Sequence, residues 1–168
     1  TVRRGLAAQL TGARVRAVTL RRPDLRHPFP EALASALTGQ TITAVRRRGK
    51  YLLLDAGAHT VLSHLGMSGS YRITAATDAA PYRRHDHMIW HLQDGRTLIY
   101  HDPRRFGYIQ LCAQAQWDAH PMLAGLGPEP LEPPLEAAHL AARLEARKQP
   151  IKQALLDQTL LAGLGNIY

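Results

Sequence analysis

The stretch 101–107, His-Asp-Pro-Arg-Arg-Phe-Gly, brings two arginines and a phenylalanine together. Its Asp-Pro pair favours the start of a turn, and Gly107 can close the turn because glycine adopts positive φ freely. A tight loop that presents Arg104, Arg105 and Phe106 suits a flat, polyanionic partner such as a nucleic acid. Guanidinium groups neutralise phosphates, and an aromatic ring can wedge between bases. The alternative is a surface turn whose Phe106 packs back into the core.

A second cationic stretch, Arg46–Lys50, holds four positive charges in five residues and leads into an apolar run. It predicts a contact with a polyanion, or else a solvated strand end. Lys50 is the sharper candidate for chemistry, because a positive neighbour such as Arg48 favours the neutral, reactive form of an amine.

Two glycine-bracketed stretches are further candidates. His64 precedes Leu-Gly-Met-Ser-Gly-Ser, in which Met67 is apolar, flexible and flanked by small residues. Met67 is therefore either an ordinary core residue or an exposed apolar wedge. Near the end of the chain, Gly-Leu-Gly-Asn166 reads as a junction before a new helix. The first N–H groups of such a helix form an anion site, to which Arg147 and Lys152 could contribute.

Three histidines, His85, His87 and His91, fall on alternating positions of an expected strand. On a regular strand they would share one face, opposite Met88 and Trp90, which would face the core. Three histidines on one face could bind a metal and support a metallohydrolase. No acidic or cysteine partner has suitable spacing, so phosphate contact or plain exposure is the competing reading of these residues.

The charge of the chain is concentrated in its first third. The 168 residues carry a net charge of +8, with a pI near 10.2, and residues 1–55 hold eleven Arg and Lys against three acids. Such asymmetry is typical of a surface that meets a polyanion, although a merely basic surface would look the same. Cys112 is the only cysteine, which excludes an internal disulfide and a cysteine-based metal site. With no long apolar run and no signal-peptide pattern, we expect a cytoplasmic protein.

The pattern along the chain predicts an α+β fold. Helices are expected at 1–10 and 30–37. Strands are expected at 15–19, 41–47, 50–55, 61–64, 87–92, 97–100 and 108–111, with a hairpin turn at Asp94-Gly95. This β-rich part predicts a two-layer sandwich with flanking helices over residues 1–116. Residues 117–134 form a Pro-rich connector. Residues 135–168 read as helical, with one helix over 135–147 and another from Pro150 to about Leu161.

Six stretches, in this order, resemble the motifs of the formamidopyrimidine-DNA glycosylases, which remove oxidised purines from DNA. They are Thr1-Val2-Arg3-Arg4-Gly5, Arg48-Gly49-Lys50-Tyr51-Leu52-Leu53-Leu54, His64-Leu65-Gly66-Met67-Ser68-Gly69-Ser70, Asp102-Pro103-Arg104-Arg105-Phe106-Gly107, Gly127-Pro128-Glu129-Pro130-Leu131 and Gly163-Leu164-Gly165-Asn166-Ile167-Tyr168. The resemblance covers essentially the whole chain. The related endonuclease VIII branch fits less well, because it usually lacks the Met-bearing and Arg-Arg-Phe loops.

The resemblance implies a β-sandwich domain followed by the start of a helix-two-turn-helix DNA-binding domain. It also implies a bifunctional glycosylase and AP lyase that flips the damaged base out of double-stranded DNA and attacks the sugar through a Schiff base. The expected substrates are DNA with 8-oxoguanine, formamidopyrimidines or abasic sites, and the expected assembly is a monomer without membrane contact.

Residue by residue, the resemblance implies that Met67, Arg104 and Phe106 fill the space left by the flipped base. Lys50 would lie near the lesion sugar and assist catalysis. His64 would contact the backbone near the lesion. Further phosphate contacts are implied for His85, Arg105, Arg147, Lys152 and Asn166.

The chain departs from the family pattern at both ends. The family's nucleophilic Pro and acid Glu lie upstream of the motif that matches Thr1, and its zinc finger lies beyond the last motif. We therefore expect a piece truncated at both ends, which is inactive as a glycosylase, while the full-length protein is active and binds Zn²⁺ outside this chain. A non-catalytic DNA-binding module remains the alternative.

Overall fold

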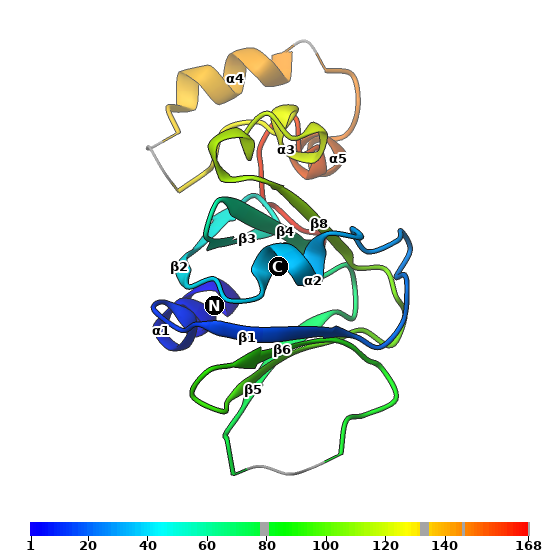
Figure 1. Cartoon of the computed structure of the whole chain (residues 1–168). Coiled ribbons are helices and arrows are strands. Elements are labelled where there is room, and N and C mark those ends of the chain that lie inside the picture. Colours follow the sequence, from blue (N-terminus) through cyan, green and yellow to red (C-terminus); the bar gives the residue numbers. More distant parts are fainter. Residues whose placement is uncertain (78–80, 132–134, 146, 168) are drawn as a thin grey trace. The chain divides into compact units, whose positions relative to one another are not determined.

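The computed structural model describes residues 1–77, 81–131, 135–145 and 147–167 (Figure 1). The chain divides into two compact units. The first contains Thr1–Arg47 and Tyr51–Gln116, and the second contains Arg48–Lys50 and Trp117–Tyr168. The short segment Arg48–Lys50 thus joins the second unit although both of its sequence neighbours belong to the first. The structure confirms the predicted α+β class.

Two four-stranded sheets form the first unit and face one another as two layers (Figure 1). One sheet has the order β1 (Val15–Leu20), β6 (Asp86–Leu92), β7 (Thr97–His101), β5 (Ser70–Thr74). The other has the order β2 (Ile42–Arg48), β3 (Tyr51–Ala56), β4 (His59–His64), β8 (Tyr108–Ala113). The predicted sandwich and its strands are confirmed to within two residues at each end, and β5 is a further strand that was not predicted.

The core of the first unit lies between the sheets, because alternate strand residues point inward. On β6 the inward side chains are those of Met88, Trp90 and Leu92, and all three are buried. Two helices add apolar residues to the same core: α1 (Val2–Leu10) and α2 (Leu33–Leu37). Each helix has leucines one turn apart that face the sheets, as the sequence spacing predicts.

Two neighbouring loops connect one sheet of the sandwich to the other. Residues 65–69 lead from β4 to β5, and residues 102–107 lead from β7 to β8. The pairing of the strands places these loops side by side, since His64 pairs with Tyr108 at one end and Ser70 pairs with His101 at the other. The Met67 loop and the Arg-Arg-Phe loop are therefore adjacent in space although they are far apart in the sequence.

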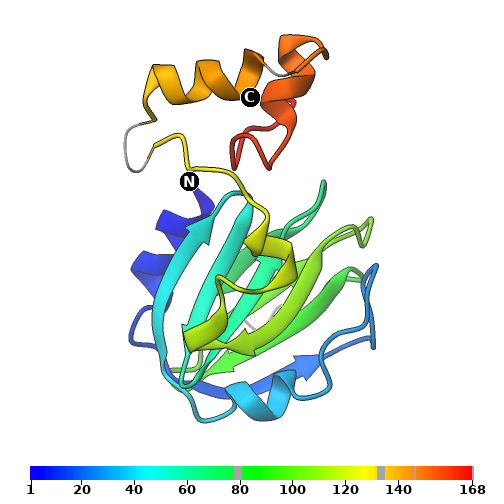
Figure 2. The same ribbon diagram turned by 90° about the horizontal axis from the view of Figure 1, so that it is seen from above.

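The second unit contains α3 (Pro121–Ala124), α4 (Ala137–Glu145) and α5 (Ile151–Leu156), which Figure 2 shows from above. Its small core consists of Ala154, Leu160 and Leu161, with leucines of α4 packed against it. The prediction that the last helix continues to about Leu161 is wrong. The chain leaves the helix at Asp157, whose carboxylate accepts hydrogen bonds from the N–H and hydroxyl of Thr159 and so favours a turn.

No helix among the described residues is long and apolar enough to cross a membrane.

Candidate nucleic-acid interface

The two adjacent loops of the sandwich expose apolar side chains that a core would normally bury. Met67 is 71% exposed and Phe106 is 45% exposed. The Arg104 guanidinium carbon lies 4.7 Å from the centre of the Phe106 ring, which is a cation–π contact. The alternatives in which Met67 and Phe106 pack into the core are therefore wrong. The loops instead present an apolar pair with a cation beside it.

The buried carboxylate of Asp102 ties the two loops together. Oδ1 accepts a hydrogen bond from the Ser68 hydroxyl at 2.6 Å, and Oδ2 accepts one from the Gly107 N–H at 2.8 Å. The Tyr100 hydroxyl donates a longer bond of 3.3 Å to Oδ2. Ser68 in turn accepts a hydrogen bond from the N–H of Arg104. One carboxylate thus holds both loops, whereas the local sequence pattern marks Asp102 only as the start of a turn.

The glycines of these loops are required by close contacts. A Cβ on Gly66 would lie 2.6 Å from the Phe106 carbonyl group, and a Cβ on Gly107 would lie 1.7 Å from the Tyr100 hydroxyl. The prediction that Gly107 closes the turn with a positive φ is wrong. Positive φ occurs instead at Arg105, at +58°, a conformation that costs a non-glycine residue about 1 kcal/mol. Two contacts accompany this conformation: the Arg105 N–H donates a hydrogen bond to the Asp102 carbonyl, and its guanidinium lies 3.9 Å from the carboxylate of Asp24, outside the loop.

The Arg-Arg-Phe loop is also hydrogen-bonded to the segment that contains His85 and His87. The Asp102 N–H donates a hydrogen bond to the His85 carbonyl, and the Asp102 carbonyl lies 2.8 Å from Nε2 of His87. Because a carbonyl only accepts, Nε2 of His87 carries the proton. Burial lowers the pKa of His87, so this ring is neutral at pH 7. His87 is thus a structural support of the loop, while the His85 side chain remains partly exposed.

A second buried carboxylate, Asp86, lies on the outer face of the same sheet. It accepts two hydrogen bonds from Arg72, one from the N–H of Arg83 at 2.7 Å and one from His101 at 2.8 Å. Burial by itself would raise the pKa of Asp86. The hydrogen bonds and the charge of Arg72 outweigh burial and hold that pKa well below its ordinary value.

The three histidines proposed as a metal site do not form one. The pairing of β6 is irregular between Asp86 and Met88, so the strict alternation on which the prediction rested is lost at His87. His91 instead lies 3.0 Å from the Thr19 hydroxyl. Within residues 1–77, 81–131, 135–145 and 147–167, no group of three or more His, Cys, Asp or Glu side chains could hold a metal ion.

His64 lies at the end of β4, where the Met67 loop begins. Its Nδ1 accepts a hydrogen bond from the N–H of Gly66 at 3.0 Å, and its ring lies 5.0 Å from that of Tyr51. Because Nδ1 accepts in this bond, the ring in its neutral form carries its proton on Nε2. The imidazole is thereby oriented by the loop that carries Met67.

Lys50 belongs to the second unit, where it approaches the glycine-rich turn at 163–166. A Cβ on Gly165 would lie 3.9 Å from Nζ of Lys50. Arg48, the cationic neighbour on which the expectation for Lys50 rests, is paired with Glu129 at 3.2 Å. The same Glu129 oxygen accepts a hydrogen bond from the N–H of Gly49 at 2.5 Å. Glu129 therefore anchors the backbone immediately before Lys50.

The remaining candidates of the second unit differ in their surroundings. Lys152 and Asn166 are exposed. Arg147 forms an ion pair with Asp157, and its hydrogen bond lowers the pKa of Asp157 to about 2. The helix expected to follow the Gly-Leu-Gly-Asn166 junction lies outside the described residues. Arg147 is thus engaged within the unit, whereas Lys152 and Asn166 face outward.

Zinc does not fit the described residues. Cys112 is the only cysteine and it lies on β8, where burial raises the pKa of its thiol and disfavours the thiolate that binds metals.

The chain matches two family models. Residues 1–109 match the formamidopyrimidine-DNA glycosylase N-terminal domain, and residues 126–168 match the formamidopyrimidine-DNA glycosylase H2TH domain. It is 49% identical over 182 residues to a formamidopyrimidine-DNA glycosylase of Rhizobium etli, with 100% of this chain and 62% of the relative covered. It is 51% identical over 168 residues to one of Stenotrophomonas maltophilia, with 100% and 61% covered.

Solved structures with similar folds come from Lactococcus lactis Fpg. The complex with abasic-site DNA has a TM-score of 0.89 and 37% identity, and covers 100% of this chain and 61% of that one. The complex with FAPY-dG-containing DNA has a TM-score of 0.88 and 36% identity, with 99% and 62% covered. The chain spans about 62% of the length of the curated relatives that it matches.

Proposed function

The chain belongs to the formamidopyrimidine-DNA glycosylase family, and from this premise we propose that the protein acts in base excision repair of oxidised purines. The proposed activity is that of a bifunctional DNA glycosylase and AP lyase, exercised by the full-length protein as a monomer in the bacterial cytoplasm. Its substrates are double-stranded DNA with formamidopyrimidines, 8-oxoguanine or abasic sites. The relatives' names and the lesion-containing DNA in the solved complexes support this proposal.

The observation that carries the proposal is the pair of exposed apolar side chains on two loops joined by one buried carboxylate. An extruded base leaves a gap in the stack, and an apolar wedge with a guanidinium beside it replaces the lost stacking and pairing. Met67 and Phe106 supply the apolar surface, and Arg104 supplies the hydrogen-bond donors. Asp102 holds Ser68 and Gly107, the neighbours of Met67 and Phe106 in the chain, so less backbone freedom has to be lost when these loops enter the duplex.

We assign the other candidates to the DNA backbone and the lesion sugar. Lys50 is the proposed catalytic residue, positioned by the anchoring of Gly49 on Glu129. His64, His85 and Arg105 of the first unit are proposed phosphate contacts. In the second unit the proposed contacts are Arg147, Lys152 and Asn166, and Arg147 must share its charge with Asp157.

Two further assignments concern the whole protein. We propose that residues 1–116 form the N-terminal domain, 117–134 a connector and 135–168 the start of the helix-two-turn-helix domain. Zinc is proposed only for sequence outside this chain, since the described residues hold no ligand set for it.

Binding to damaged DNA tests the proposal without requiring turnover. The chain should bind a duplex with an abasic or formamidopyrimidine site more tightly than the same undamaged duplex. Phe106→Ala should reduce that preference about tenfold, since stacking of one base on an aromatic ring contributes about 1–3 kcal/mol. Leu131→Ala is the matched control, because Leu131 is 77% exposed and lies outside both loops. Equal binding to damaged and undamaged duplexes by the unmodified chain would refute the proposal.

A further inference from the structure

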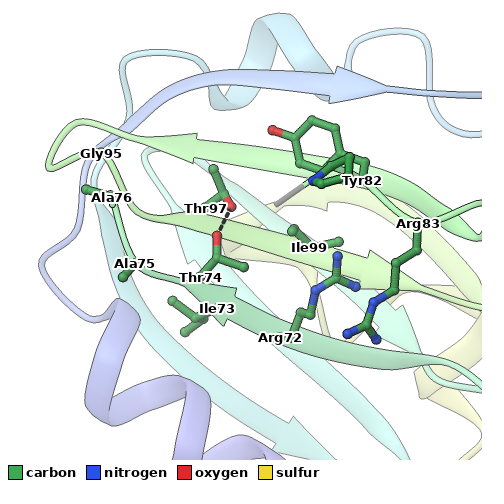
Figure 3. Close-up of a pocket in the computed structure, with 11 residues that line it drawn as sticks. Arg72, Ile73, Thr74, Ala75, Ala76, Tyr82, Arg83, Gly95, Thr97 and Ile99 are labelled. Atoms are coloured by element: carbon green, nitrogen blue, oxygen red, sulfur yellow. Dashed lines mark hydrogen bonds between the residues drawn. The ribbon is translucent and has the colours of Figure 1, made fainter. Parts of the chain in front are cut away.

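A pocket of about 560 Å³ opens on the outer face of the β1-β6-β7-β5 sheet, on the side away from the core. Its floor is formed by β5 and β7, and its wall includes Ala75 and Ala76 after β5 and Pro81, Tyr82 and Arg83 before β6 (Figure 3). The lining residues are Arg72, Ile73, Thr74, Ala75, Ala76, Pro81, Tyr82, Arg83, Gly95, Thr97 and Ile99. A volume of this size is typical of small-molecule sites.

Positive charge is in excess at one end of the pocket. Arg72 and Arg83 both line it, and Arg21 is anchored beside them through hydrogen bonds to the carbonyl groups of Arg83 and Asp86. Among the described residues at this end of the pocket, the acid is Asp86, which accepts hydrogen bonds from Arg72 and His101. The Arg83 side chain has no hydrogen bond or ion pair with any residue that the structure describes. Counted over the described residues, three guanidinium groups lie around one carboxylate, which leaves positive charge for an anion.

The remaining lining suits a flat ring with polar substituents. The ring of Tyr82 lines the pocket, is 42% exposed, and has the Arg21 guanidinium carbon 5.7 Å from its centre. Ile99 contributes an apolar patch of floor, and the hydroxyl groups of Thr74 and Thr97, which are hydrogen-bonded to each other, lie next to it (Figure 3). An aromatic ring stacks on any nucleobase, and hydroxyl groups can bond a sugar.

The pocket is distinct from the interface built on the Met67 and Arg-Arg-Phe loops. Those loops join β5 and β7 at the pair Ser70 and His101, whereas the pocket extends from the pair Arg72 and Ile99 to the pair Thr74 and Thr97. The pocket therefore begins two residues along the strands from the loops, about 7 Å, and ends four residues along, about 13 Å. The loops and the pocket use different residues of these strands.

We propose that this pocket binds a single nucleotide unit, with the phosphate on Arg83 and Arg72 and the base on Tyr82. The unit is either a free mononucleotide or one residue of single-stranded nucleic acid, which present the same chemistry. The site is separate from the proposed repair chemistry and does not depend on it.

Arg83→Gln is the sharpest test, because the structural hydrogen bonds at this position are made by the backbone. The N–H of Arg83 donates to Asp86 and its carbonyl accepts from Arg21, so the substitution removes the charge and keeps both bonds. Arg84→Gln is the matched control, since Arg84 is the next residue, is exposed and does not line the pocket. Tyr82→Ala tests the stacking surface.

The measurement is calorimetric titration of the chain with dGMP, with a single-stranded oligothymidylate and with inorganic phosphate. We expect saturable binding of dGMP or of the oligothymidylate. The ligand that binds shows whether the pocket takes a free mononucleotide or one residue of a single strand. Arg83→Gln and Tyr82→Ala should each weaken that binding at least tenfold, and Arg84→Gln should leave it within twofold. The proposal is overturned if neither nucleotide ligand binds, if Arg83→Gln binds as tightly as the unmodified chain, or if inorganic phosphate binds as tightly as dGMP.

Discussion

Replacing Asp102 by alanine should loosen both exposed loops at once. The carboxylate accepts hydrogen bonds from Ser68, Gly107 and Tyr100, which belong to three different segments. Ser68 is partly exposed and can turn to water, but the Gly107 N–H and the Tyr100 hydroxyl are buried and would lose their acceptor. Each buried donor without a partner costs about 1–3 kcal/mol, so the free energy of unfolding should fall by about 3 kcal/mol.

Asp102→Asn should have a smaller effect. The amide oxygen can still accept from Gly107 and Tyr100, while the amide nitrogen forces the Ser68 hydroxyl to accept instead of donate. Exchange of a charged acceptor for a neutral one should lower the free energy of unfolding by about 1 kcal/mol. Asp94→Asn is the matched control, because its side chain is 48% exposed and its ion pair with Arg96 is a surface pair worth less than about 1 kcal/mol.

Urea denaturation measures the stability of the three variants, and amide hydrogen exchange at Gly66 and Gly107 reports on the loops. We expect Asp102→Ala to be the least stable, then Asp102→Asn, then Asp94→Asn. Exchange should accelerate at both glycines in Asp102→Ala, although only Gly107 bonds directly to the carboxylate. If Asp102→Ala matched Asp94→Asn in stability, or if Gly66 kept its protection, Asp102 would not be the link between the loops.

Two further predictions concern contacts and pH. Gly107→Ala should destabilise the protein by about 3 kcal/mol, because the added Cβ would overlap the Tyr100 hydroxyl. Gly5→Ala should stabilise it by about 0.5–1 kcal/mol, because Gly5 lies inside α1, its added Cβ would meet nothing within 4 Å, and alanine favours a helix more than glycine does. Thermal melting should show a lower melting temperature for Gly107→Ala and a higher one for Gly5→Ala, and equal changes in melting temperature would contradict the contact argument. The free energy of unfolding should also fall as the pH drops below about 6.5, because the pKa of buried His87 is lowered and the unfolded chain therefore binds this proton first. It should fall again below about 4, because the pKa of Asp86 is lowered in the folded protein and the unfolded chain protonates this carboxylate first. Urea midpoints between pH 8 and 3 check this, and His87→Gln should remove or reduce the first decrease.

The strands and the core of the first unit were predictable because they follow from local periodicity. Alternation along β6 correctly places Met88 and Trp90 in the core, and Asp94-Gly95 correctly marks the hairpin turn. The same rule failed at His87, since a strand irregularity at this position cannot be read from side-chain types. β5 was not predicted, although Ser70–Thr74 alternates polar and apolar side chains and its Tyr71 and Ile73 pack against the core.

The candidate site was predictable in its residue types but not in its geometry. The sequence alone pointed to Arg104, Phe106 and Met67, because an arginine–aromatic turn and a glycine-bracketed methionine are recognisable locally. Their exposure and their proximity depend on the pairing of β4 with β8 and of β5 with β7. These pairings join residues 23 to 54 positions apart, and no local pattern specifies them.

The sequence by itself determined the α+β class, the inward face of the strands and the residue types that suit DNA, because these depend on side-chain chemistry and spacing along one segment. Only the tertiary structure decided the roles of the acidic side chains. Asp102 joins two loops, and Asp86 accepts hydrogen bonds from Arg72, Arg83 and His101. Glu129 pairs with Arg48 and accepts a hydrogen bond from the N–H of Gly49. A buried carboxylate acts through the donors that the fold brings to it from distant segments, so its function exists only after folding.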